Sequence, residues 1–202
     1  MGSYYYLVSQ LPYLIFGQKP PMSSAAFKAL AKTLISEGDA ALLETVELEP
    51  QPLKQGDKSP SYANKALASG SGFIDGWREW ERTLRLNVAR HRAIKSNHEE
   101  LILVEPPMFP IDAATAAVKA VIATESPLAG EILIDKARWN AIDVLQGFDY
   151  FGRDSIFAYL LKLILLERQE KFKTEEGFTE YKSLYASILG SAQSGTRVGE
   201  PK

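Results

Sequence analysis

The chain has 202 residues, of which 46% are apolar and 24% are charged. This is an ordinary composition for a globular protein, and the length is enough for one substantial core. With 23 basic and 25 acidic side chains the formal net charge is −2, so no overall positive field attracts nucleic acid or an anionic membrane. The absence of cysteine excludes disulfides, thiol nucleophiles and cysteine metal sites, and it fits a reducing cytosol.

The N-terminal part of the chain predicts three short elements. Residues 4–8, Tyr-Tyr-Tyr-Leu-Val, are expected to form a short helix or an extended arm that packs through its tyrosines, and they do not resemble a signal peptide. A serine cap predicts a helix over 23–37, which Gly38 ends. Asp39 is the predicted cap of a second helix that runs to residue 48.

The strongest pattern in the chain predicts a long helix over 73–96, after an irregular loop over 49–72. Apolar residues recur at helical spacing on one of its faces, and we expect the tryptophans here, and Trp139 further on, to lie in the core. This face carries Phe73, Trp77, Trp80, Leu84, Val88 and His91. The opposite face, which we expect to be solvated, carries Arg78, Glu79, Glu81, Arg82, Arg85, Arg90 and Arg92.

The second half of the chain predicts four more helices, since each segment joins a start signal to helical periodicity. Their ranges are 112–125, 127–146, 154–173 and 175–189, with Asp112, Pro127 and Asp154 at the first three starts. The segment 155–166 is apolar almost all round but too short to cross a bilayer, so we expect that it lies at the centre of the fold rather than under a partner. A disordered tail is expected over 190–202.

No segment shows the alternation of a strand. The sequence therefore predicts an all-α protein with about seven helices in one bundle-like domain over 1–189. An arrangement as two helical repeats is an alternative within this class.

Motifs that carry chemistry are scarce. The sequence has no Gly-rich phosphate loop, no Gly-x-Ser-x-Gly elbow and no His-Glu-x-x-His. His91 and His98 are the only histidines, and no further ligands accompany them at helical spacing. We therefore predict no metal and no cofactor, with His91 packed or hydrogen-bonded and His98 solvated.

Three carboxylates near Trp139 are the best candidates for a general acid, which needs a dry cleft. They are Asp135, Asp143 and Asp149. A solvated helix face and a loop are the favoured interpretation of these residues. The prediction is that the protein is not an enzyme.

The arginines of the 73–96 helix are candidate interaction residues. They are Arg78, Arg82, Arg85, Arg90 and Arg92. A row of arginines can follow phosphates, but Glu79 and Glu81 interrupt this one and the chain is slightly acidic. Docking of an acidic protein surface, or pairing within the chain, is favoured over nucleic-acid binding.

Three segments, taken in order, resemble a known family. They are Tyr-Tyr-Tyr-Leu-Val-Ser-Gln-Leu-Pro at 4–12, Trp-Arg-Glu-Trp-Glu-Arg-Thr-Leu-Arg-Leu-Asn-Val-Ala-Arg at 77–90, and the stretch 127–168 with Ala-Arg-Trp at 137–139. They are similar to a family of short, uncharacterised bacterial proteins encoded among the subunits of vacuolar/archaeal-type ATPases. These proteins look like divergent counterparts of the central-stalk C (or d) subunit.

The resemblance implies an all-α, non-catalytic rotor adaptor without a cofactor. Its partners would be the proteolipid ring and the central axle of the ATPase, with no nucleic acid. It would be cytoplasmic and peripheral at the inner face of the membrane, held there only through these protein partners. The alternative is a helical scaffold or regulatory interaction module unrelated to the ATPase.

Overall fold

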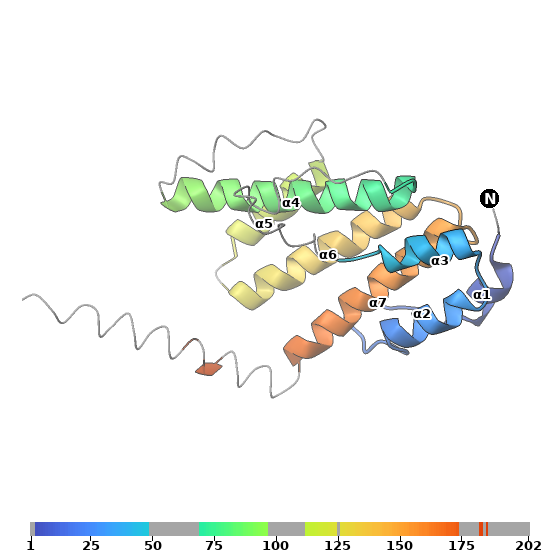
Figure 1. Cartoon of the computed structure of the whole chain (residues 1–202). Helices are drawn as coiled ribbons and strands as arrows, with labels where there is room; N and C mark the ends of the chain where they lie inside the picture. Colours follow the sequence, from blue (N-terminus) through green and yellow to red (C-terminus); the bar gives the residue numbers. More distant parts are fainter. Residues whose placement is uncertain are drawn as a thin grey trace, which may run out of the picture.

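The computed structural model describes residues 3–48, 69–96, 112–124 and 126–173, together with 182, 183 and 185. In these residues it shows helices and no strand (Figure 1), which confirms the all-α prediction. The helices are α1 (Tyr5–Gln10), α2 (Ser24–Lys32), α3 (Glu37–Glu44), α4 (Gly72–Ser96), α5 (Asp112–Ile122), α6 (Pro127–Gln146) and α7 (Arg153–Lys173).

The helices form a bundle in which α7 has a central place. On one side of α7 lies α6, which packs against α5 and α4; on its other side lies α2, which packs against α3. The short helix α1 lies at the end of the bundle where α7 begins (Figure 1). The amide of Tyr4, just before α1, donates to the carbonyl of Phe151 in the turn between α6 and α7, at 2.7 Å. Buried apolar residues from all of these helices join in one hydrophobic cluster.

The apolar helix predicted to be central is α7, and this prediction is confirmed. It is in contact with α2, α4 and α6, so its apolar side chains are covered on several faces, as expected for a helix without a polar stripe. Its fully buried residues are Ile156, Phe157, Ala158, Leu160, Leu161, Leu163, Leu165 and Leu166.

The boundary between α2 and α3 differs from the prediction. The predicted helix over 23–37 ends at Lys32, and Gly38 lies in the first turn of α3 instead of ending a helix. The cap of α3 is Ser36, whose hydroxyl accepts from the amide of Asp39 at 3.2 Å. Asp39 is therefore not the cap; its carboxylate accepts a hydrogen bond from the Tyr4 hydroxyl.

The starts of α6 and α7 are close to their predicted positions. Pro127 occupies the first turn of α6, and the hydroxyl of Ser126 caps it by accepting from the amide of Ala129 at 3.4 Å. The prediction that Asp154 caps α7 is wrong by two positions, since the helix begins at Arg153 and Asp154 lies in its first turn. The predicted helix over 112–125 ends earlier, at Ile122.

Several predictions lie mostly outside the described residues. These are the loop over 49–72, the helix over 175–189 and the tail over 190–202; within the helix, Lys182, Ser183 and Tyr185 are described and are helical. Among the described helices, none has both the length and the hydropathy that a bilayer span requires.

Candidate functional site

The charged face of α4 is partly buried, in contrast to the prediction. Glu81 is only 3% exposed, and Thr83 and Leu86 are also buried. Because α5 and α6 both pack against α4, more of its circumference is covered than its apolar stripe indicates. The expectation of a solvated face is therefore wrong for Glu81.

Two of the candidate interaction arginines are held by carboxylates of their own helix. Arg82 pairs with Glu79 at 3.2 Å, and Arg85 pairs with Glu81 at 2.8 Å. Such i,i+3 and i,i+4 pairs stabilise a helix by a few tenths of a kcal/mol when they are exposed. Pairing within the chain, one of the interpretations left open by the sequence, applies to these two arginines.

The other three arginines of α4 differ in their surroundings. Arg78 donates to the carbonyl of Thr45 after α3, at 3.2 Å. Arg90 is half-buried and Arg92 is exposed. A docking role for the five arginines stays a prediction.

A buried ion-pair network joins α4, α6 and α7. Its centre is Arg138 on α6, which donates to both carboxylate oxygens of Glu81 on α4, at 2.7 and 3.1 Å. Arg138 also donates to Asp135 at 3.1 Å. Arg168 on α7 pairs with Asp135 as well, and it reaches Glu131 at 2.6 Å. Three helices are thus held by hydrogen-bonded charges that lie largely out of water.

Burial and the neighbouring charges shift the pKa values in this network. Burial raises the pKa of Asp135 above its ordinary value, and the guanidinium groups of Arg168 and Arg138 oppose this rise. Burial acts to lower the pKa of Arg138, but the carboxylates of Glu81 and Asp135 outweigh it and raise that pKa. Asp135 is 1% exposed, so its predicted place on a solvated face is wrong. Since each buried carboxylate is paired with arginine, the network fixes the packing of the helices.

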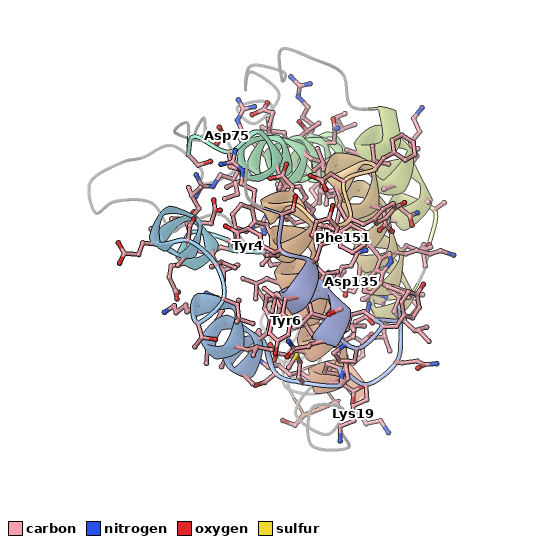
Figure 2. All side chains as sticks on the ribbon, turned by 90° about the vertical axis from the view of Figure 1, so that its right-hand side faces the viewer. Tyr4, Tyr6, Lys19, Asp75, Asp135 and Phe151 are labelled. Atoms are coloured by element: carbon pink, nitrogen blue, oxygen red, sulfur yellow. The ribbon has the colours of Figure 1, made fainter. Side chains whose placement is uncertain are left out.

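Exposed aromatic side chains gather at the α1 end of the bundle. The ring of Tyr5 lies 4.5 Å from the ring of Phe151, and Figure 2 shows Tyr6 and Phe151 on the same face of the molecule. We call this surface the aromatic end; it consists of Tyr5, Tyr6, Tyr13, Phe148, Tyr150 and Phe151. Phe148 is 95% exposed and Tyr13 is 87% exposed. The prediction that this short helix packs through its tyrosines applies to Tyr4, which is half-buried, and to Tyr5, whose ring contacts Phe151, whereas Tyr6 is 71% exposed.

A groove of about 490 Å³ lies beside the aromatic end. One wall comes from α6, where Trp139, Asp143 and Gln146 follow at spacings of four and three. The other comes from α7, where Ser155, Tyr159 and Lys162 follow at the same kind of spacing. The third side is the segment 11–16 after α1.

Polar contacts hold the walls of this groove together. The ammonium of Lys162 lies 2.5 Å from Asp143 and 5.1 Å from the centre of the Trp139 ring, so a cation–π contact accompanies the ion pair. The hydroxyl of Tyr159 donates to the carbonyl of Pro12 at 2.8 Å and thereby holds the segment 11–16 against α7. Burial raises the pKa of Tyr159 to about 12.

Two of the remaining candidate residues, Trp139 and Asp143, line the groove. Trp139 was predicted in the core, but it is half-buried and lines the groove, with its ring edge-on to that of Phe16 at 5.6 Å. Asp143 is exposed, as predicted. Asp149 is exposed in the turn before α7, where its carboxylate accepts from the amides of Phe151 and Gly152 at 3.1 and 2.8 Å.

The candidate metal ligands can be checked only in part. His91 is half-buried on α4, and His98 lies outside the described residues. The described part of the chain contains no group of three or more His, Asp or Glu side chains that could hold a metal ion.

Comparison with known proteins gives one match. No curated protein and no solved structure matches the chain. A family model described as a protein of unknown function (DUF2764) matches residues 116–189. This range includes α6 and α7 with their parts of the network and the groove, but it includes neither Glu81 nor the segment 11–16.

Proposed function

We propose that this protein is a non-catalytic adaptor that binds other proteins through its aromatic end. Its more specific role is that of a C/d-like central-stalk subunit of a vacuolar/archaeal-type rotary ATPase, between the proteolipid ring and the central axle. The aromatic end is the observation that carries the protein-binding role. The assignment to the ATPase is supported by the resemblance of the segments 4–12, 77–90 and 127–168.

The chemistry of the aromatic end suits a protein partner. Large aromatic side chains lose much of their apolar area from water on binding, and tyrosine and tryptophan are enriched where binding energy is concentrated. Single exposed apolar residues are common on protein surfaces, whereas a contiguous group marks a contact site. Phe148 is 95% exposed and has almost no packing within its own chain. Burying it in an interface therefore removes apolar area from water without breaking contacts within the chain.

The buried network supports a mechanical role. An adaptor that passes torque must resist sliding of its helices, and Arg138 ties α4 to α6 while Arg168 ties α6 to α7. Moving one helix relative to the others would leave a buried charge without its partner, which costs several kcal/mol. The bundle therefore deforms less easily than one held by apolar contacts alone.

The experiment is affinity purification of the tagged full-length protein from gently solubilised native membranes, with mass spectrometry of the chains that co-purify. Recovery of catalytic, axle and proteolipid subunits of the ATPase supports the proposal. The variants Tyr6→Asp and Phe148→Asp should lose these partners while keeping the helical circular dichroism of the parent. Ile122→Asp is the control, because Ile122 is an exposed apolar residue (51%) that lies at the end of α5.

Two outcomes would count against the proposal. Co-purification of an unrelated protein, with the ATPase present in the extract, would favour the helical scaffold or regulatory module. Full retention of ATPase subunits by both aromatic-end variants would contradict the role of this surface.

A further inference from the structure

We infer that the groove between α6, α7 and the segment 11–16 binds an extended, proline-containing peptide with a basic residue at one end. The inference rests on the proposed protein-binding function only in so far as the groove adjoins the aromatic end. It deepens that function by naming the chemistry of a partner segment.

The lining of the groove favours the polyproline II conformation. Five aromatic rings line it, from Tyr13, Phe16, Trp139, Tyr150 and Tyr159. Proline-rich segments are recognised in grooves lined with aromatic rings, because the flat proline rings pack on the aromatic ones. A polyproline II segment is also already ordered before it binds. Two of the three walls are made of helix side chains and present no strand edge, so a partner strand finds no backbone groups to pair with on α6 or α7.

The polar groups of the groove suit such a peptide as well. A polyproline II segment makes no hydrogen bonds within itself, so its carbonyl oxygens need donors. Lys162 offers three N–H donors, of which the pair with Asp143 uses one. Gln146 also lines the groove, and its amide has no hydrogen bond to another described residue. The two side chains place donors on both helical walls.

The charged side chains of the groove indicate that the peptide carries a basic residue at one end. One carboxylate oxygen of Asp143 accepts from Lys162, and the other has no partner among the described residues. The Asp143 side chain is 51% exposed, whereas that of Lys162 is 15% exposed. Within this ion pair the carboxylate is therefore the more accessible member, and its second oxygen can accept from an arginine or lysine of the ligand.

The test uses the purified full chain and synthetic probes. The probe is a fluorescein-labelled oligoproline ending in arginine; one comparison peptide ends in glutamate, and another of equal length has glycine and serine in place of proline. Fluorescence anisotropy measures binding, and the indole N–H signal of Trp139 in an NMR spectrum, assigned with Trp139→Phe, locates it. We expect the arginine probe to bind and to shift this signal, and both comparison peptides to bind more weakly.

Substitutions of exposed side chains separate the contribution of charge to peptide binding from that of the aromatic rings. Asp143→Lys should weaken binding of the arginine probe about fivefold, which corresponds to the loss of an exposed ion pair. It should also abolish the preference for the arginine probe over the glutamate probe. Tyr13→Ala should weaken both oligoproline probes by about tenfold, because it removes an aromatic face. The control Glu37→Lys reverses an exposed carboxylate of α3 away from the groove and should change nothing.

The inference is overturned if no oligoproline probe binds, or if the glycine–serine probe binds equally well. It is also overturned if the Trp139 signal shifts with protein concentration alone, because this would show that a second copy of the chain binds in the groove. Neither result affects the co-purification experiment, which does not depend on proline peptides.

Discussion

Replacing Arg138 by methionine should destabilise the fold strongly. The guanidinium of Arg138 is the direct link between Glu81 and Asp135, whose side chains are 3% and 2% exposed. Methionine keeps most of the aliphatic bulk of arginine. It removes the positive charge, so the two buried carboxylates lose one of their ion-pair partners. Removing one partner of a buried ion pair costs 3–5 kcal/mol. Arg85 and Arg168 still contact these carboxylates, so we expect a loss at the lower end, about 3 kcal/mol.

Urea unfolding followed by far-ultraviolet circular dichroism measures this loss. For a chain of this size the same change lowers Tm by about 6–12 °C. The matched control is Lys136→Met, which removes an exposed charge from the same helix and should stay within about 0.5 kcal/mol of the parent. In the double variant Arg138→Met with Glu81→Met, more than about 1 kcal/mol should be recovered, because the uncompensated carboxylate of Glu81 is gone.

The pH dependence of the Arg138→Met variant follows from Asp135. The pKa of Asp135 is raised in the folded state above its ordinary value of 3.8, so its contribution to stability is full below pH 3.8 and is lost as pH rises through the folded pKa. Without Arg138 that pKa rises further, and the deficit of the variant relative to the parent should shrink as pH falls from 7 toward 4. A loss below about 1 kcal/mol at pH 7, or a double variant that costs the sum of the two single ones, would refute this account of the network.

Three further predictions concern the groove and the turns. Tyr159→Phe removes the hydrogen bond to Pro12 and should cost about 1 kcal/mol in urea unfolding at pH 7. Since the pKa of Tyr159 is raised from 10.0 to about 12, the parent should lose more stability than the variant as pH rises between these values; equal pH slopes would contradict this. Gly152→Ala places a methyl group against the Asp149 carboxylate and should lower the unfolding free energy by about 1–3 kcal/mol. Gly38→Ala meets nothing within 4 Å and should raise it by about 0.5 kcal/mol, so equal effects of the two alanine substitutions would contradict the packing of the turn.

The sequence predicts the helices better than their surroundings. Periodicity and start signals such as Pro127 depend on neighbours along the chain, and they locate α4, α6 and α7 to within a few residues. The cap of α3 was assigned wrongly because Ser36 and Asp39 are both good caps. In the structure the Ser36 hydroxyl accepts from the Asp39 amide, whereas the Asp39 carboxylate accepts from the distant Tyr4 hydroxyl.

The site was harder to predict because its residues are distant in sequence. Glu81 and Arg138 are 57 positions apart, and a glutamate among arginines on α4 is typical of a solvated face. The spacing of Asp135 and Arg138 was a usable signal of pairing, but burial was not readable from it. Likewise Trp139 is apolar at a helical spacing that suits a core, and the segment 11–16 that makes it a groove residue comes from the other end of the chain.

The most direct test of the central claim is to identify the molecule that contacts the aromatic end in its native setting. A photo-crosslinking amino acid at Phe148, which is 95% exposed, is activated in native membranes, and the crosslinked chain is identified by mass spectrometry. The account predicts a crosslink to a proteolipid or axle subunit of the ATPase. Crosslinks only to proteins outside the ATPase, in membranes where the ATPase is present, would contradict it.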